Sequence, residues 1–114
     1  MPKPAPARFL TSEQFLEWLE PGLHADLIGG EIHMHSPVNL RHANLVNFLD
    51  RLLAGYLEET GLGVLHRETV AVRLSVRETF LPDLCYFTRA QAARLLPTHA
   101  PFAPTFVAEV LSPA

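Results

Sequence analysis

The sequence contains little that could anchor the chain in a membrane, export it or cross-link it. Its one cysteine, Cys85, stands in an apolar run and can form neither an internal disulfide nor a site of several thiolates, so we expect a buried free thiol. No run of about 18 apolar residues is present, and the residues after Met1 lack the apolar region of a signal peptide. We therefore expect no membrane-spanning helix and a soluble protein of the reducing cytoplasm.

Positive charge is also scarce. Nine Lys and Arg residues stand against twelve Asp and Glu residues, the formal net charge is −3, and the one lysine is Lys3. Since no overall positive field attracts phosphate, a histone-like binder is excluded and any contact with nucleic acid depends on local arginines. The sequence also lacks a glycine-rich phosphate loop, a nucleophile elbow and a His-Glu-x-x-His motif, which excludes P-loop kinases, α/β-hydrolases and zincins.

The length and composition indicate one small globular domain. With 114 residues, 48% of them hydrophobic and 18% charged, the chain can form one core but not a two-domain enzyme. Pro2, Pro4 and Pro6 alternate near the start and predict an extended segment. We assign residues 1–10 to a flexible tail and residues 11–114 to the domain.

Helices and strands are predicted to alternate along the domain. Thr11 and Gln14 form a capping-box pattern for a helix ending before Pro21-Gly22, and two short strands follow, joined at Gly29-Gly30. Leucines at helical spacing predict a long helix that Gly61 closes. Apolar and polar residues alternate from Val64 to Arg77 and predict one long strand with one solvent-exposed face.

The last third of the chain predicts two strands around a short helix. LPDLCYF is the first strand, a helix capped by Thr88 runs through Leu96, and TFVAEVL is apolar on both sides of Glu109, as in a central strand. The order indicates an α/β or α+β fold with helices packed on a sheet. Because only Ser112, Pro113 and Ala114 follow, we expect an incomplete domain lacking a C-terminal helix and strand, with cover by another chain, as in a homodimer, as the alternative.

Two carboxylates lie in or beside apolar strands. Asp83 and Glu109 would be costly to bury as ions unless a cation or several donors compensate them, and oxygen ligands of this kind suit Mg²⁺ or Mn²⁺. The alternative is that Asp83 caps its strand after Pro82 and that Glu109 pairs with an arginine such as Arg73.

Five segments together resemble a family of small bacterial endonucleases in the restriction-endonuclease-like, PD-(D/E)XK superfamily. They are the helix TSEQFLEWLE, the hairpin ADLIGGEIHMHSP, the histidine of LRHANL, and the strands LPDLCYF and FVAEVLSP. The resemblance covers residues 11–113, and the last two strands are its most specific part. It implies a mixed β-sheet flanked by helices, one divalent cation, and hydrolysis of DNA phosphodiester bonds.

The resemblance also implies roles for individual residues. Asp83 and Glu109 would bind the metal together with the backbone carbonyl of Val110. Glu31 would orient the attacking water or a second cation, and His42 would contact a phosphate or support the acids, although either could be an ordinary surface residue. Asp26 matches a commonly acidic position but could equally bond nearby backbone amides.

The match fails at the catalytic lysine. The superfamily places a lysine two residues after the glutamate, where this chain has Leu111, and the family supplies it from a following helix instead. We therefore keep a second hypothesis, a non-catalytic copy that binds DNA or a protein partner.

Other polar and aromatic residues have open interpretations. His33 and His35 share a strand face and could bind zinc with His24 or His42, but strand spacing alone explains them. Three arginines of the long strand could contact a phosphate backbone or line a solvated face; these are Arg67, Arg73 and Arg77. Three aromatic residues could stack on bases or fill the core; these are Trp18, Phe48 and Tyr56.

Overall fold

A computed structural model of the chain describes residues 9–35, 39–67 and 70–111. The elements in chain order are α1 (Ser12–Trp18), β1 (Ala25–Ile28), β2 (Glu31–Met34), α2 (Leu40–Thr60), β3 (Gly63–Arg67), β4 (Val72–Ser75), β5 (Glu78–Phe80), β6 (Leu84–Thr88), α3 (Arg89–Ala92) and β7 (Phe106–Ala108). The predicted mixture of helices and strands is confirmed.

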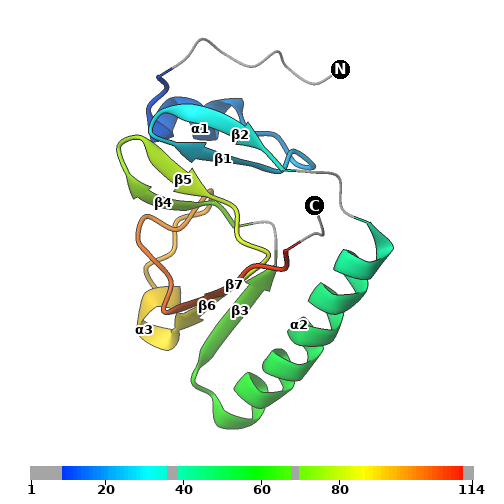
Figure 1. The fold of residues 1–114 in the computed structure, drawn as a ribbon. Helices are drawn as coiled ribbons and strands as arrows, with labels where there is room; N and C mark the ends of the chain where they lie inside the picture. Colours follow the sequence, from blue (N-terminus) through cyan, green and yellow to red (C-terminus); the bar gives the residue numbers. More distant parts are fainter. Residues whose placement is uncertain (1–8, 36–38, 68–69, 112–114) are drawn as a thin grey trace.

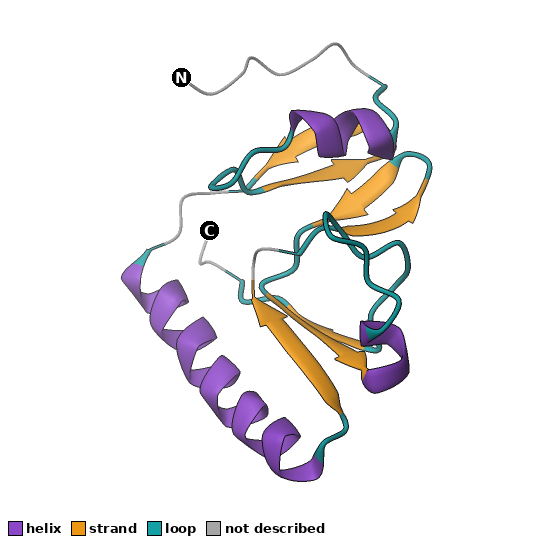
Figure 2. Cartoon of the chain, turned by 180° about the vertical axis from the view of Figure 1, so that it is seen from behind, coloured by secondary structure: helices purple, strands orange, loops and turns teal. Residues whose placement is uncertain are grey.

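The strands form two sheets. One has the order β2-β1-β5-β4 and the other β3-β6-β7, and neighbours within each sheet are antiparallel. Tight turns join β1 to β2 and β4 to β5, and such turns allow only antiparallel pairing. This arrangement replaces the single mixed sheet that the resemblance implies. In Figure 1, α1 lies on the four-stranded sheet, while α2 and α3 lie on opposite sides of the three-stranded sheet. Figure 2 shows the same arrangement from behind.

Local signals place the helix ends and the first hairpin as predicted. Thr11 and Gln14 form a reciprocal capping box at the start of α1. Gly29 and Gly30 have φ values of 58° and 87°, which a glycine adopts at little cost, and they turn the β1–β2 hairpin. Gly61 ends α2 in the left-handed conformation, with φ 64°.

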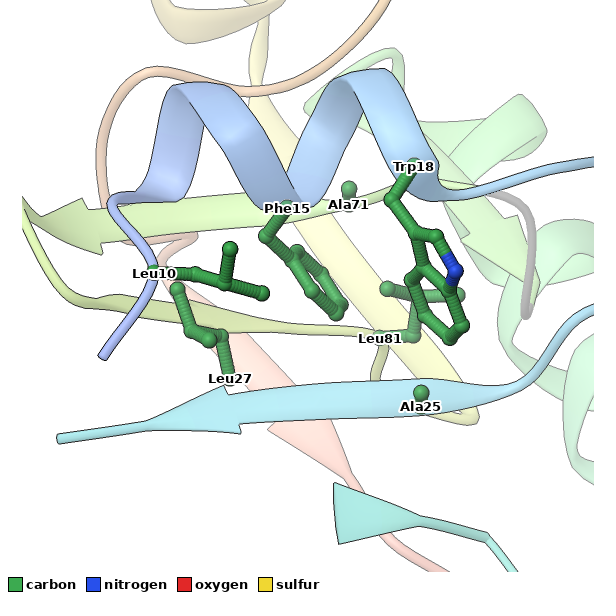
Figure 3. Packing of buried hydrophobic residues seen from close by; sticks show 7 residues of the cluster. All are labelled: Leu10, Phe15, Trp18, Ala25, Leu27, Ala71 and Leu81. Carbon is green, nitrogen blue, oxygen red and sulfur yellow. The ribbon is translucent and has the colours of Figure 1, made fainter. Parts of the chain in front are cut away.

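The larger core cluster lies between α1 and the four-stranded sheet. Phe15 and Leu27 are fully buried there, and Trp18 closes one end (Figure 3). Leu10 also belongs to this cluster, and its N–H donates to the carbonyl of Gly30. Leu10 is therefore part of the folded domain, although the sequence analysis placed it in the tail; residues 1–8 lie outside the described residues.

The prediction of one long strand from Val64 to Arg77 is wrong. The strand is divided between β3 in one sheet and β4 in the other, and Val76-Arg77 forms a turn. The carbonyl of Val76 accepts from the N–H of Ser12, and that of Arg77 from the N–H of Gly30, so α1 and the first hairpin hold this turn.

The prediction of a central last strand is also corrected. Within the described residues, β7 pairs only with β6 and forms the edge of its sheet. Phe106 and Val107 are about half exposed there, at 49% and 48%. The helix predicted through Leu96 ends at Ala92, although Thr88 caps it as expected.

Candidate active site

Asp83 lies between the two sheets, on the three-residue segment that joins β5 to β6. It is 8% exposed, and both carboxylate oxygens have partners. Oδ1 is 3.2 Å from Nε2 of His42 on α2, and Oδ2 accepts a hydrogen bond of 2.6 Å from the N–H of Val110. The side chain is thus fixed from two elements that lie far from it in the sequence.

The strand register brings Glu109 to the same sheet end. Leu84, the first residue of β6, pairs with Ala108, the last residue of β7. Because the two strands are antiparallel, Asp83, immediately before β6, and Glu109, immediately after β7, flank the same paired position. The predicted convergence of these two carboxylates is therefore built into the pairing.

Asp26 ties the Asp83 segment to the four-stranded sheet. Its Oδ1 accepts a hydrogen bond of 2.8 Å from the N–H of Leu81, and its Oδ2 is 3.0 Å from Nε2 of His35. Leu27 on β1 pairs with Thr79 on β5, and the chain leaves this pairing at Leu81. The Asp26 carboxylate accepts the Leu81 N–H, which no longer has a partner in the sheet. Pro82 has no N–H of its own, and the chain then reaches Asp83.

The three acids interact electrostatically. Partial burial of the carboxyl group raises the pKa of Glu109, and the charges of Asp83 and then Asp26 raise it further, whereas His35 and a backbone hydrogen bond from Asp83 lower it. Residue Glu109 itself is exposed at the surface. The three acids therefore lie close enough for their charges to act on one another, and a cation would offset that interaction.

The structure brings together some of the predicted site residues and not others. Asp83, Glu109, Val110 and His42 lie together. Glu31 does not join them: it is exposed at the turn end of the first hairpin, paired with Ile28, whereas Asp26 lies toward the other end.

His35 is the residue that sequence reasoning ranked too low. It reaches Asp26 and lies beside His24, with 6.4 Å between ring centroids. The one signal in the sequence was its alternation with His33, and in the structure it lies directly after β2. Arg73, the predicted alternative partner of Glu109, instead lies 3.9 Å from Glu13.

Two features are absent from the described part of the chain. In residues 9–35, 39–67 and 70–111, no group of three or more His, Cys, Asp or Glu side chains is arranged to hold a metal ion. Over the same ranges, no helix is long and apolar enough to cross a membrane.

Two comparisons place the chain among restriction-endonuclease-like proteins, one by family and one by fold. A family model described as putative restriction endonuclease, Uma2, matches residues 12–114, and the chain belongs to this family. No curated protein matches the chain.

Among solved structures, the chain is similar to a crystal structure of a putative nuclease of the DUF820 group from Anabaena variabilis. The TM-score is 0.74 at 17% sequence identity, and the match covers 94% of this chain and 59% of that one. The likeness establishes the fold, and this chain spans about three fifths of the length of that nuclease.

Proposed function

We propose that this domain is a metal-dependent endonuclease that hydrolyses DNA phosphodiester bonds. The observation that carries the proposal is the convergence of Asp83 and Glu109 on one end of the β6–β7 pair, with the backbone of Val110 bonded to Asp83. Membership of a family described as putative restriction endonuclease supports a nuclease-like activity.

The donor set fits Mg²⁺ or Mn²⁺. Carboxylate oxygens of Asp83 and Glu109 and the carbonyl of Val110 are hard oxygen ligands, and one ion of this kind needs only two carboxylates when water completes the shell. The neighbouring charges of Asp83 and Asp26 that act on Glu109 support this assignment, because a cation would offset them. A bound ion would polarise the scissile phosphate and lower the pKa of a coordinated water.

The protein groups around the pair have a positioning task. His42 and the N–H of Val110 fix the two oxygens of Asp83, so that carboxylate cannot rotate away from Glu109. Asp26 accepts the N–H of Leu81, two residues before Asp83, and so fixes the backbone of the segment that carries Asp83. Such fixed geometry removes reorganisation cost when charge develops on a phosphate.

A non-catalytic binding module is the second candidate, and one observation favours it. Leu111 occupies the place two residues after Glu109 where the superfamily has its lysine, and it is 88% exposed. A missing transition-state charge partner typically lowers the rate by about two to three orders of magnitude.

Nicking of supercoiled plasmid DNA tests the two candidates. The chain is assayed with Mg²⁺, with Mn²⁺ and with EDTA, alongside Asp83→Asn, Glu109→Gln and the control Glu59→Gln, an exposed residue near the end of α2. An endonuclease nicks only with metal, loses activity in the first two variants and keeps it in the control. DNA binding without metal-dependent nicking, unchanged by either site variant, would refute the enzyme and establish the module.

A further inference from the structure

A polar groove lies beside the carboxylate site, between α2 and the end of β3. It has a volume of about 500 Å³ and is lined by Asn44, Asn47, Asp50, Arg51 and Arg67. Every lining side chain is polar, and four of the five carry N–H donors. Neither the metal site nor its positioning groups use this groove.

The strand register places the groove next to the acids. Arg67, the last residue of β3, pairs with Leu84, and Leu84 pairs with Ala108. Arg67 therefore lies at the same sheet end as Asp83 and Glu109. Strands are spaced about 4.8 Å apart, so the main chain of Arg67 is roughly 10 Å from that of Glu109, which equals the rise of about three base pairs along the axis of a DNA duplex.

The long helix connects the same two places. His42, in the first turn of α2, contacts Asp83, and Asn44 and Asn47 follow within the next two turns. Arg51 lies one turn beyond Asn47 and shares its side of the helix. The groove residues therefore begin within two turns of His42 along α2, on a different side of the helix, and Arg67 is the groove residue that lies at the sheet end of the acids.

The arginine at the sheet end is held in place. Arg67 Nη1 donates to Oδ1 of Asn47, and its Nε is 3.7 Å from Oδ2 of Asp50. The Arg67 side chain is still 48% exposed, so its planar guanidinium faces solvent in a fixed orientation. Asp50 is the one acid in the groove, and its charge is balanced by Arg67.

We propose that this groove binds the sugar–phosphate backbone of the DNA strand whose phosphodiester is cut, so that Arg51, Arg67 and the two asparagines position it over the acids. The inference rests on the proposed function and names the contact surface for its substrate. Arginine and asparagine N–H groups are the usual donors to phosphate oxygens, and such contacts set register and affinity without reading sequence. In a chain of net charge −3, this is local positive charge of the kind that phosphate binding needs.

Fluorescence anisotropy with a labelled DNA duplex of mixed sequence tests the groove. CaCl₂ is present because Ca²⁺ takes oxygen ligands and offsets the charge of the acids. Arg51→Ala is the main variant, because Arg51 is exposed, and Arg67→Ala is the second. The matched control is Arg94→Ala: Arg94 lies over the Phe102 ring, 5.1 Å from its centroid, after α3 on the other side of the sheet.

The loss of one phosphate contact has a defined signature. The slope of log K against log salt becomes shallower by about 0.9, which at 0.1 M salt corresponds to about an eightfold loss of affinity. We expect this in Arg51→Ala and Arg67→Ala, with equal effect on unrelated sequences, and no change in Arg94→Ala.

Three outcomes overturn the inference, and they are distinguishable. If the unaltered chain binds and nicks DNA while both groove variants keep its affinity and salt slope, the groove assignment fails and the proposed function stands. If the unaltered chain neither binds nor nicks any DNA, both fail. If polyglutamate displaces the duplex as effectively as unlabelled DNA does, the groove is a site for an acidic protein segment.

Discussion

The bond between Asp26 and the Leu81 N–H should stabilise the start of the segment that connects the two sheets, and replacing Asp26 tests this. In Asp26→Ala, the Leu81 N–H loses a charged acceptor at 2.8 Å, a type of bond that contributes about 1.5–3 kcal/mol. The contact with His35 is partly exposed, with side chains 27% and 22% accessible, and adds at most about 1 kcal/mol. We expect a loss of about 2–3 kcal/mol in the free energy of unfolding.

Asp26→Asn is the matched comparison. Its amide oxygen can still accept from the Leu81 N–H, so we expect it to cost only about 1 kcal/mol. Both variants remove the charge that acts on Glu109, so the difference between them isolates the Leu81 bond. Urea unfolding followed by the fluorescence of Trp18, the one tryptophan and a member of the core cluster, measures both. Equal stabilities for the two variants would refute the reasoning.

Three further predictions follow from burial, charge and close packing. The raised pKa of Glu109 means that the folded state favours the neutral carboxyl group, so in EDTA the stability should fall as the pH rises through this pKa. Glu109→Gln should flatten the curve of Tm against pH in EDTA, and an unchanged curve would contradict this prediction. Cys85 is 1% exposed and burial raises its pKa to about 11, so iodoacetamide at mildly alkaline pH should label it only in urea, as mass spectrometry would reveal; labelling of the native chain would disprove its burial. In Gly63→Ala the new Cβ would meet the carbonyl oxygen of Phe87 at 2.1 Å, so the β3–β6 pairing should separate and Tm fall, whereas Gly55→Ala, in open space on α2, should leave Tm unchanged or higher; equal Tm values would contradict the packing.

The sequence was sufficient where structure depends on nearby residues. The ends of α1 and α2 and the first hairpin follow from side chains and glycines within a few positions of the turns that they make, such as Thr11, Gly30 and Gly61. The division of the strands into two sheets was not predictable in this way. Val72 is buried while Leu74 and Val76 are exposed, and the turn after β4 accepts hydrogen bonds from Ser12 and Gly30, which lie far away in the sequence.

The candidate site also has parts that the sequence could predict and parts that it could not. Their positions beside apolar segments marked Asp83 and Glu109, and the register places both at one sheet end, although Glu109 is exposed there and not buried. Their role as metal ligands stays a prediction. The place of Asp26 depends on the N–H of Leu81, 55 residues away, and no pattern near Asp26 carries that information. His35 was a candidate zinc ligand in the sequence, but its contact with Asp26 was not predicted.

The short connection from β5 to β6 gives Leu81 two tasks at once. Its side chain lies in the core cluster under α1, its N–H is held by Asp26, and Asp83 follows two residues later. A change in the size of the Leu81 side chain would therefore shift the backbone that carries a proposed metal ligand. Substitutions at other positions of the cluster should change stability alone, whereas a substitution at Leu81 should change both stability and the proposed activity. The two properties could therefore not vary independently at Leu81.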